Sequence, residues 1–401
     1  MNYILYIIKK YRKGALFITT LFVLFYNFTY AQILSNVDSK CLWVNKDDIY
    51  DTLAVDSVFD FAIKNNINKL FIESISNGEA AYESDLIYKD EMIDSIFDPL
   101  NYFLYKSEFE DIEIHACMNA YLLWSKSTLP SDETHFYYNC NDCFESDFNG
   151  KSDGEINLYL NQSKNWEGVY ISPMHPVVNK YLLSVIEELF ENYNIDGLVL
   201  DYIRFQDSFY GYNKFGIDVF SDKYNIDPRD IDRGIISTRF GYSEEFIDSI
   251  NNSWDNFRTD KVTELVRSIK YRILNDTLDI EFSVFVKPNY KMAKERWHQD
   301  WMSWINEDII DFAIIKNYYN NFSEFNYINK VLSNELTDYI QKNKIIIGIN
   351  SSNDNPISIS NKILLSRLQG YEHFSIYSYD IDKDTLNWYS PIFKSINFDL
   401  N

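Results

Sequence analysis

The chain is 401 residues long and strongly acidic, with 60 aspartates and glutamates against 37 lysines and arginines and a net charge of −23. So negative a charge argues against nucleic acid and anionic membrane surfaces as partners. The length exceeds that of an average domain, but an α/β barrel with loop insertions reaches it as a single unit. Aromatic residues make up 17% of the chain. This content is consistent with a carbohydrate-binding site, and equally with a general bias of the sequence toward tyrosine.

The first 31 residues have the pattern of a secretory signal peptide. Four basic residues precede an apolar run from Ala15 to Phe28, and Thr29-Tyr30-Ala31 matches a cleavage site. We therefore expect cleavage after this site, which leaves residues 32–401 as one domain in the bacterial periplasm or outside the cell. The apolar run is short for a membrane span, so we expect no stable span after cleavage; an uncleaved anchor is the alternative.

Apolar, strand-sized segments alternate with helix-sized segments along most of the remaining chain. Eight segments are predicted to be strands: Leu42–Val44, Lys69–Glu73, Ile112–Cys117, Gly197–Asp201, Phe282–Val286, Asp311–Ile315, Ile345–Ile349 and His373–Tyr377. Seven predicted helices lie between them: Thr52–Lys64, Ile93–Tyr105, Pro176–Tyr193, Trp254–Leu274, His298–Asn306, Phe325–Lys342 and Ser358–Leu368. This alternation predicts a (β/α)8 TIM barrel, with a doubly wound sheet as the second choice.

The segment Asn194–Phe205 carries the clearest indication of a site. Its residues 198–200 form an apolar run typical of a parallel strand buried on both faces, and Asp201 ends that strand. In both candidate architectures, chemistry collects at the C-terminal ends of parallel strands. Asp201 is therefore the leading site carboxylate, although a residue at this position can also simply cap the next turn.

Long connections follow three of the predicted strands, at residues 74–95, 120–172 and 202–253. The connections that return from helix to strand are short. Long loops after the strands of a barrel build the rim of an active site at that end. We therefore expect the residues at the strand ends to gather there: Glu73, Asn119, Asp201, Lys287, Tyr318 and Tyr377.

Two of the four cysteines, Cys140 and Cys143, are three residues apart in a segment predicted to be a loop. No second Cys-x-x-Cys motif or nearby histidine pair completes a zinc set in the sequence. Outside the cytoplasm, such a pair fits a local disulfide, with free thiols as the alternative. We expect these cysteines to take no part in catalysis, and we expect no metal and no cofactor.

Carboxylates, amides and aromatic residues near the strand ends are the groups that glycoside hydrolysis uses. The reaction needs one carboxyl group as an acid and a second as a nucleophile or base. Asp201 is predicted to be the nucleophile or base; Asp300 is the first choice for the acid and Glu73 the second. The predicted substrate-binding residues are Tyr202, Arg204, His115, Asn119, Asn289, Trp301, Tyr318 and Tyr377.

Three of these residues have a plainer interpretation. Trp301 can pack a helix, His115 can be a satisfied core histidine, and Arg204 can pair with Asp201 or another acid to hold a loop. In the functional interpretation, Tyr202 and Arg204 position Asp201.

From about Trp43 to Tyr379, the chain resembles the glycosyl-hydrolase-like 10 proteins of bacteria. The matching segments are Gly78–Ser84, His115–Asn119, Gly168–Pro176, Asp196–Arg204 and Gln299–Trp304. The resemblance implies a (β/α)8 barrel and a secreted or periplasmic glycan hydrolase. It also implies, as a candidate substrate, peptidoglycan strands stripped of their stem peptides.

The chain departs from that family at three places. Cys117 stands where tryptophan is usual, Val199 replaces a histidine, and Ile315-Lys316-Asn317 stands near a usual Pro-Met. These departures leave open a rival hypothesis, a non-catalytic glycan-binding protein on a decayed barrel. A polysaccharide deacetylase is disfavoured because the Asp/His spacing of its metal site is absent. The preferred hypothesis is a secreted glycoside hydrolase acting on a polysaccharide.

Overall fold

Eight parallel strands close into a barrel in the computed structural model, which describes residues 39–159, 166–336, 342–352 and 354–397. Going around the barrel, the strands are β1 (Ser39–Val44), β2 (Lys69–Ser76), β4 (Glu113–Asn119), β7 (Gly197–Asp201), β8 (Glu281–Val286), β9 (Phe312–Lys316), β10 (Ile345–Asn350) and β11 (His373–Tyr377). Strand β1 pairs with both β2 and β11, so the sheet has no open edge between its first and last strands. The predicted (β/α)8 barrel is confirmed, and the doubly wound alternative is wrong.

Side chains alternate between the inside of the barrel and the layer of helices around it. The inward residues form one cluster: Cys41, Trp43, Phe71, Cys117, Val199, Phe285, Ile314 and Ile346. Their neighbours along each strand, such as Leu42 and Leu198, belong to the larger core against the helices. The two-residue period of a strand produces this division, and bulky interior side chains fill the barrel so that it is not a pore.

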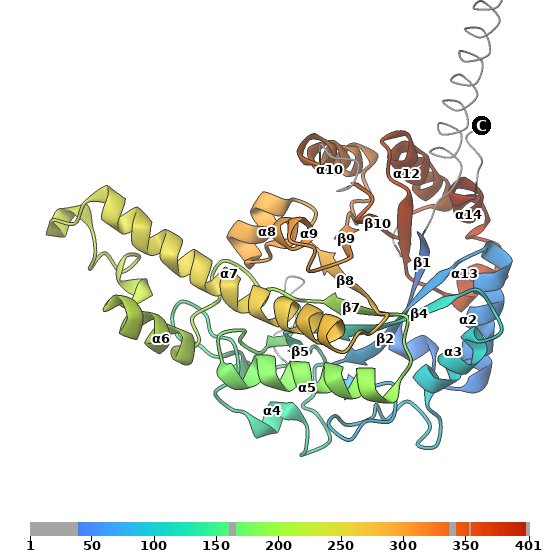
Figure 1. The fold of residues 1–401 in the computed structure, drawn as a ribbon, viewed down its shortest axis with the longest axis horizontal. Coiled ribbons are helices and arrows are strands. Elements are labelled where there is room, and N and C mark those ends of the chain that lie inside the picture. The colour runs from blue at the N-terminus through green and yellow to red at the C-terminus, as the bar shows by residue number, and fades with distance from the viewer. Residues whose placement is uncertain (1–38, 160–165, 337–341, 353, 398–401) are drawn as a thin grey trace, which may run out of the picture.

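Helices surround the barrel (Figure 1). They are α2 (Thr52–Asn65), α3 (Pro99–Ser107), α4 (Phe136–Asn139), α5 (Pro176–Asn192), α6 (Lys214–Tyr224), α7 (Glu244–Asn275), α8 (Tyr290–Trp297), α9 (Trp301–Asn306), α10 (Phe322–Glu335), α12 (Pro356–Leu368), α13 (Ile381–Thr385) and α14 (Ser390–Ile396). Each of the seven predicted helices has a counterpart here, although several boundaries differ. Figure 1 shows α7 running beside α5 and extending past the barrel.

Local capping explains the boundaries that the apolar pattern misses. Helix α3 begins at Pro99, six residues after the predicted start, because the Asp98 side chain accepts a hydrogen bond from Asn101 N and Pro99 suits the first turn. Helix α7 begins at Glu244, ten residues early, because Ser243 caps it and its first turns are polar. The C-terminal part of the helix predicted to end at residue 342 lies partly outside the described residues.

Short elements organise the long connections. Strand β3 (Glu79–Ala80) adds to β2 antiparallel, and β5 (Leu122–Trp124) pairs with β6 (Val169–Tyr170) in a second small sheet. Cys140 and Cys143 form a disulfide, which is one of the two states left open by the sequence. The predicted signal peptide, residues 1–31, lies outside the described residues. Among the helices that the structure describes, none is long and apolar enough to cross a membrane.

A buried ion cluster fills the N-terminal end of the barrel. Lys69 pairs with Glu113 at 2.9 Å and also with Glu281. His115 is fully buried and contacts the same two carboxylates, with Nε2 at 3.1 Å from Glu113 and Nδ1 at 3.8 Å from Glu281. The prediction that His115 binds substrate is therefore corrected: it faces the barrel interior near the beginning of β4, at the end opposite the candidate site.

Candidate active site

A cleft of about 880 Å³ opens beyond the C-terminal ends of β7, β8 and β9. Its walls come from the segments that follow these strands, from Glu167 in the long connection after β4, and from the start of α10. The lining residues are Glu167, Tyr202, Arg204, Lys287, Pro288, Asn289, Met292, Trp297, Lys316, Tyr318, Tyr319, Ser323, Glu324, Tyr327 and Ile328. The cleft thus lies at the end of the barrel where the strand pattern places the chemistry.

Asp201 ends β7 next to this cleft and is 8% exposed. Both of its carboxylate oxygens accept hydrogen bonds from Lys316 Nζ, at 2.6 and 2.5 Å, and one also accepts from Tyr202 N at 2.7 Å. Tyr202 has a φ of 51°, in the left-handed region that a tyrosine rarely adopts. The strained turn after β7 therefore aims the Tyr202 amide at the carboxylate, and Lys316 supplies the opposite charge.

Glu167 is the second carboxylate of the cleft. Its two oxygens accept hydrogen bonds from Arg204 Nη2 at 2.8 and 2.7 Å, and the Tyr170 hydroxyl donates to it at 2.7 Å. Burial opposes ionisation of Glu167, but the positive charge of Arg204 holds its pKa below the usual value. Arg204 therefore pairs with Glu167 and not with Asp201, and the expected support of Asp201 by Arg204 is replaced by Lys316.

Lys287 brings a third positive charge to the cleft. Its ammonium lies 3.9 Å from Glu167 and 4.9 Å from the centre of the Trp297 ring. Burial, followed by the repulsion of Arg204, lowers the pKa of Lys287 to about 8. The group is thus charged at neutral pH but gives up its proton more easily than an ordinary lysine.

Aromatic side chains line the cleft around these charges. Tyr319 is 44% exposed and Tyr327 is 64% exposed, so their rings are open to a ligand. Tyr318 stacks on Tyr377 with ring centres 5.6 Å apart, and its buried hydroxyl has no hydrogen-bond partner among the described residues. Rings with one apolar face and a polar tip suit the faces and hydroxyls of sugars.

Glu73 lies near the same end of the barrel but does not line the cleft. Its carboxylate accepts a hydrogen bond from Lys46 N at 3.0 Å, and burial raises its pKa. The negative charges of Glu73 and Asp201 both raise the pKa of Tyr377 and that of Cys117, although burial is the larger cause in each case. These two carboxylates therefore lie around the same barrel mouth.

The remaining strand-end residues also lie at this end. Asn119 pairs in register with Asp201 on the neighbouring strand. Asn289 lines the cleft and caps α8, because its side-chain oxygen accepts from Met292 N at 3.1 Å. The expected gathering at one end of the barrel is what the structure shows.

Besides His115, two further predicted site residues lie outside the cleft. Asp300 pairs with Lys294 at 2.7 Å and does not line the cleft, so it is not placed to be the general acid. Trp301 is fully buried, and its indole nitrogen donates to Lys287 O at 3.1 Å. Trp301 thus packs the base of the loop that carries Lys287 and offers no surface to a sugar.

Two cleft residues were not singled out as site residues from the sequence. Glu167 directly precedes the family-like segment Gly168–Pro176, but its partner Arg204 is 37 residues away. Lys316 lies at one of the noted departures from the family, and its partner Asp201 is 115 residues away. Because that departure introduces a charge at the end of a strand, it could have indicated Lys316 as a site residue.

The chain belongs to the glycosyl hydrolase-like 10 family, whose model matches residues 34–362. Among curated proteins, an S-layer-related protein from Niallia circulans is 27% identical over 108 residues, which are 27% of this chain and 6% of that protein. The chain therefore spans only a small part of that relative.

Solved structures share the barrel. The glycoside hydrolase domain of PgaB (BpsB) from Bordetella bronchiseptica has a TM-score of 0.66 at 12% identity, with 90% of this chain and 99% of that chain covered. The catalytic domain of β-amylase from Paenibacillus polymyxa has a TM-score of 0.58 at 10% identity, with 90% and 99% covered. An α-L-fucosidase from Paenibacillus thiaminolyticus has a TM-score of 0.57 at 10% identity, with 90% and 50% covered.

At these identities the likenesses concern the fold alone. The family and the barrel shared with glycoside hydrolases together support a glycoside hydrolase-type function.

Proposed function

We propose that this protein is a secreted glycan hydrolase in which Asp201 acts as the nucleophile or base. The observation that carries the proposal is the position of Asp201 beside a cleft at the C-terminal end of the barrel, between Lys316 and the stacked rings of Tyr318 and Tyr377. An ionised carboxylate on a rigid strand end is what attack on a sugar or activation of a water requires.

The other groups of the cleft have separate tasks in this proposal. Glu167, held ionised by Arg204, accepts hydrogen bonds from sugar hydroxyls. Tyr319 and Tyr327 stack against the apolar faces of the sugar rings. Glu73 lies around the same barrel mouth as Asp201, and burial raises its pKa, so we assign to it the general acid.

One cation of the cleft is only loosely paired and can contact an acidic glycan. The charges of Arg204, Lys287 and Lys316 are balanced by those of Asp201, Glu167 and Glu324, but Lys287 lies 3.9 Å from its carboxylate neighbour, so it is the cation offered to a ligand. Peptidoglycan strands stripped of stem peptides carry a free lactyl carboxylate on alternate sugars. We propose such strands as the first substrate to test.

One observation favours a second candidate function, a glycan-binding protein without catalysis. Both carboxylates closest to the ligand are held by cations, Asp201 by Lys316 and Glu167 by Arg204, and Glu73 does not line the cleft. A site that needs only to bind could retain these ion pairs without any protonated carboxyl group.

Cleavage and binding assays separate the two candidates. The full chain is incubated with stripped peptidoglycan strands and with neutral polysaccharides, and new reducing ends are identified by mass spectrometry. Release of fragments from the stripped strands supports the hydrolase proposal. Binding of a glycan without fragments supports the binding protein, and neither binding nor cleavage of any glycan in the panel overturns both.

A further inference from the structure

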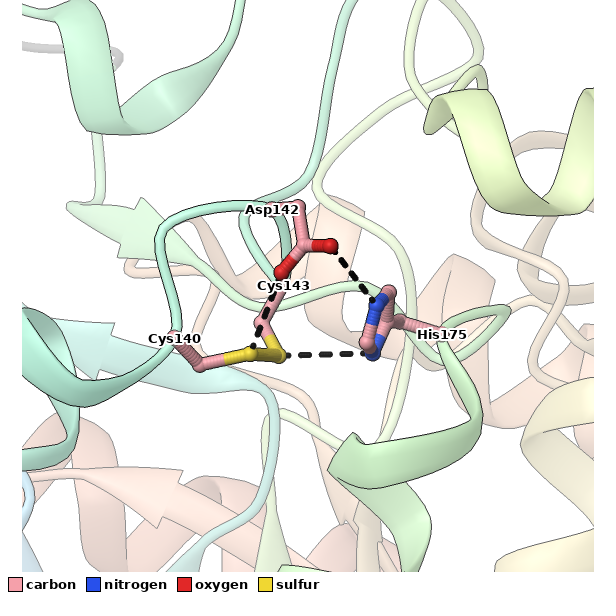
Figure 2. Close-up of side chains that lie close together, drawn as sticks. All are labelled: Cys140, Asp142, Cys143 and His175. Carbon is pink, nitrogen blue, oxygen red and sulfur yellow. Dashed lines mark hydrogen bonds and ion pairs between the residues drawn. A yellow bond between two sulfur atoms is a disulfide. The ribbon is translucent and has the colours of Figure 1, made fainter.

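Four side chains with metal-ligand atoms converge where α4 ends and α5 begins, away from the cleft (Figure 2). Cys140, Asp142 and Cys143 lie in the turn after α4, and His175 is the residue before α5. Figure 2 shows the imidazole of His175 turned toward both the cysteine sulfurs and the Asp142 carboxylate. None of the four residues lines the candidate active site.

Two spacings between the ligand atoms match a tetrahedral metal site, and the two bonded sulfurs must separate to complete it. Zinc binds sulfur at about 2.3 Å and nitrogen or oxygen at about 2.0 Å, which puts neighbouring ligand atoms of a tetrahedron about 3.3–3.8 Å apart. Cys143 Sγ lies 3.3 Å from His175 Nδ1, and Cys140 Sγ lies 3.5 Å from Asp142 Oδ1. All four ligand atoms lie within 4.8 Å of one another.

His175 offers one ring nitrogen to a metal, at the cost of a long capping hydrogen bond. Its Nδ1 accepts from Val177 N at 3.4 Å as the cap of α5, and a metal would take over this lone pair. The same Nδ1 faces Cys143 Sγ, and Nε2 lies 3.6 Å from Asp142 Oδ2. Cys143 and His175 are buried, whereas the Asp142 side chain is 85% exposed and leaves a path for an ion from solvent.

We propose that Cys140, Asp142, Cys143 and His175 bind one zinc ion when both cysteines are thiols, in place of the disulfide that otherwise joins them. Binding releases the two thiol protons to solvent and changes no oxidation state. Opening the disulfide beforehand takes two electrons and two protons; a phosphine and water supply them, and the phosphine becomes its oxide.

The disulfide and the proposed zinc ion cross-link different parts of the chain. The disulfide joins residues only 3 positions apart, so it closes a very short loop and constrains little of the unfolded chain. A metal held also by His175 joins Cys143 to a residue 32 positions away and fixes the long connection after β4 to the start of α5. Zinc should therefore stabilise the reduced protein more than the disulfide stabilises the oxidised one.

Zinc stoichiometry on the full chain tests the proposal. The protein is reduced with a phosphine, incubated with zinc, desalted and analysed by mass spectrometry of the metal. We expect one zinc per reduced chain and none on the oxidised chain. With cobalt in place of zinc, we expect the intense visible absorption of a tetrahedral thiolate site. Zinc should also raise the melting temperature of the reduced chain.

Matched variants identify the ligands. The Cys140→Ser, Cys143→Ser double variant should lose the zinc, whereas Cys41→Ala, Cys117→Ala removes the same number of thiols from the barrel interior and should keep it. His175→Asn preserves a capping oxygen but removes the imidazole, and it should weaken zinc binding on the order of 10–100-fold or more.

Three results would overturn the proposal. One is a reduced wild-type chain that retains no more zinc than the double serine variant. Another is equal zinc binding by the oxidised and reduced chains, which would show that the thiolates are not ligands. The third is wild-type affinity in His175→Asn, which would remove the histidine from the site. The assay does not depend on glycan cleavage, so it stands or falls independently of the proposed function.

Discussion

The two ends of the barrel interior both hold lysine–carboxylate clusters, but among the described residues the pockets beside them differ in size and lining. At the N-terminal end, Lys69 lies between Glu113 and Glu281, and Glu113 lines a pocket of about 320 Å³ that has no aromatic residue in its wall. At the C-terminal end, Lys316 holds Asp201 beside a cleft of about 880 Å³ lined with exposed aromatic rings. Both ends thus pair a lysine with strand carboxylates, and they differ in the pocket that lies beside the pair.

Ion pairs and shifted pKa values alone therefore do not mark a functional site in this protein. At the N-terminal end, the hydrogen bond from His115 and the charge of Lys69 lower the pKa of Glu113 to about 2, which is as large a perturbation as that of Lys287 in the cleft. What distinguishes the C-terminal end is the larger cleft with aromatic rings in its wall, together with the strand ends and long loops that a barrel uses for chemistry.

The largest expected effect is a difference in glycan cleavage between two substitutions, one at Asp201 beside the cleft and one at Asp300 away from it. Asp201→Asn should reduce glycan cleavage by ~10²–10⁴-fold, because the neutral amide cannot act as a nucleophile or base. Asp300→Asn, which removes a carboxylate paired with Lys294 outside the cleft, should leave turnover at the wild-type level. Rates of reducing-end release measure both, with circular dichroism as a check of folding. Wild-type turnover in Asp201→Asn on a confirmed substrate would remove Asp201 from the mechanism.

The next effect compares the two lysines. Lys69→Met should lower the free energy of unfolding by about 1–3 kcal/mol, because Glu113 and Glu281 lose their shared cation, although solvent reaches 48% of the Glu113 side chain. Lys316→Met should cost a similar amount, about 1–3 kcal/mol, because Asp201, whose side chain is 11% exposed, loses its cation. Urea unfolding measures both changes. Glycan affinity should change in Lys316→Met and stay at the wild-type value in Lys69→Met. A loss of affinity in Lys69→Met alone would contradict the assignment of the site to the C-terminal end of the barrel.

A smaller effect concerns the rings that line the cleft. Tyr327→Ala should weaken glycan binding by about 0.5–1.5 kcal/mol, or roughly three- to tenfold, because an aromatic contact with the ligand is lost. Tyr271→Ala is the matched control, because this tyrosine on α7 is 71% exposed but does not line the cleft. Calorimetry in the Asp201→Asn background measures binding without cleavage. Equal losses in both variants would show that the effect is not local to the cleft.

The smallest effect is a pH dependence of stability that arises from Lys287. Its pKa is about 8 in the folded chain, against about 10.4 for an unfolded lysine. Between these values the unfolded state binds more protons, so this group makes the free energy of unfolding rise as pH increases from 8 toward 10.4. Lys287→Met should lack that rise. Chemical unfolding of both proteins measures the free energy of unfolding across this pH range. The same slope against pH in wild type and variant would contradict the lowered pKa of Lys287.

The fold could be predicted because its evidence is local. Apolar runs such as residues 198–200 mark buried strands, and stripes such as that of α5 mark the helices that cover them. Eight such strands in alternation with helices close a barrel without further information. Helix α8 escaped prediction because it has 8 residues and a mostly polar sequence, with Asn289 as the cap that starts it.

The site was less predictable because it depends on contacts between distant segments. The sequence placed His115 on a predicted strand, but it did not show that this residue lies near the start of the strand, among Glu113 and Glu281. Asp300 follows β8 in the chain, yet the turns of α8 carry it to Lys294. The pairs of Glu167 with Arg204 and of Asp201 with Lys316 arise only when the barrel closes.

That closure also determines when the protein can complete its fold. Strand β1 pairs with β11 through registers such as Ser39 with His373, and a hydrogen bond between their side chains joins residues 334 positions apart. Contacts of such long range slow folding, because a large loop must be closed before they form. A chain still being synthesised, or cut before His373, leaves β1 and β10 with unpaired edges. Premature termination should thus yield an aggregation-prone open sheet and not a smaller working barrel.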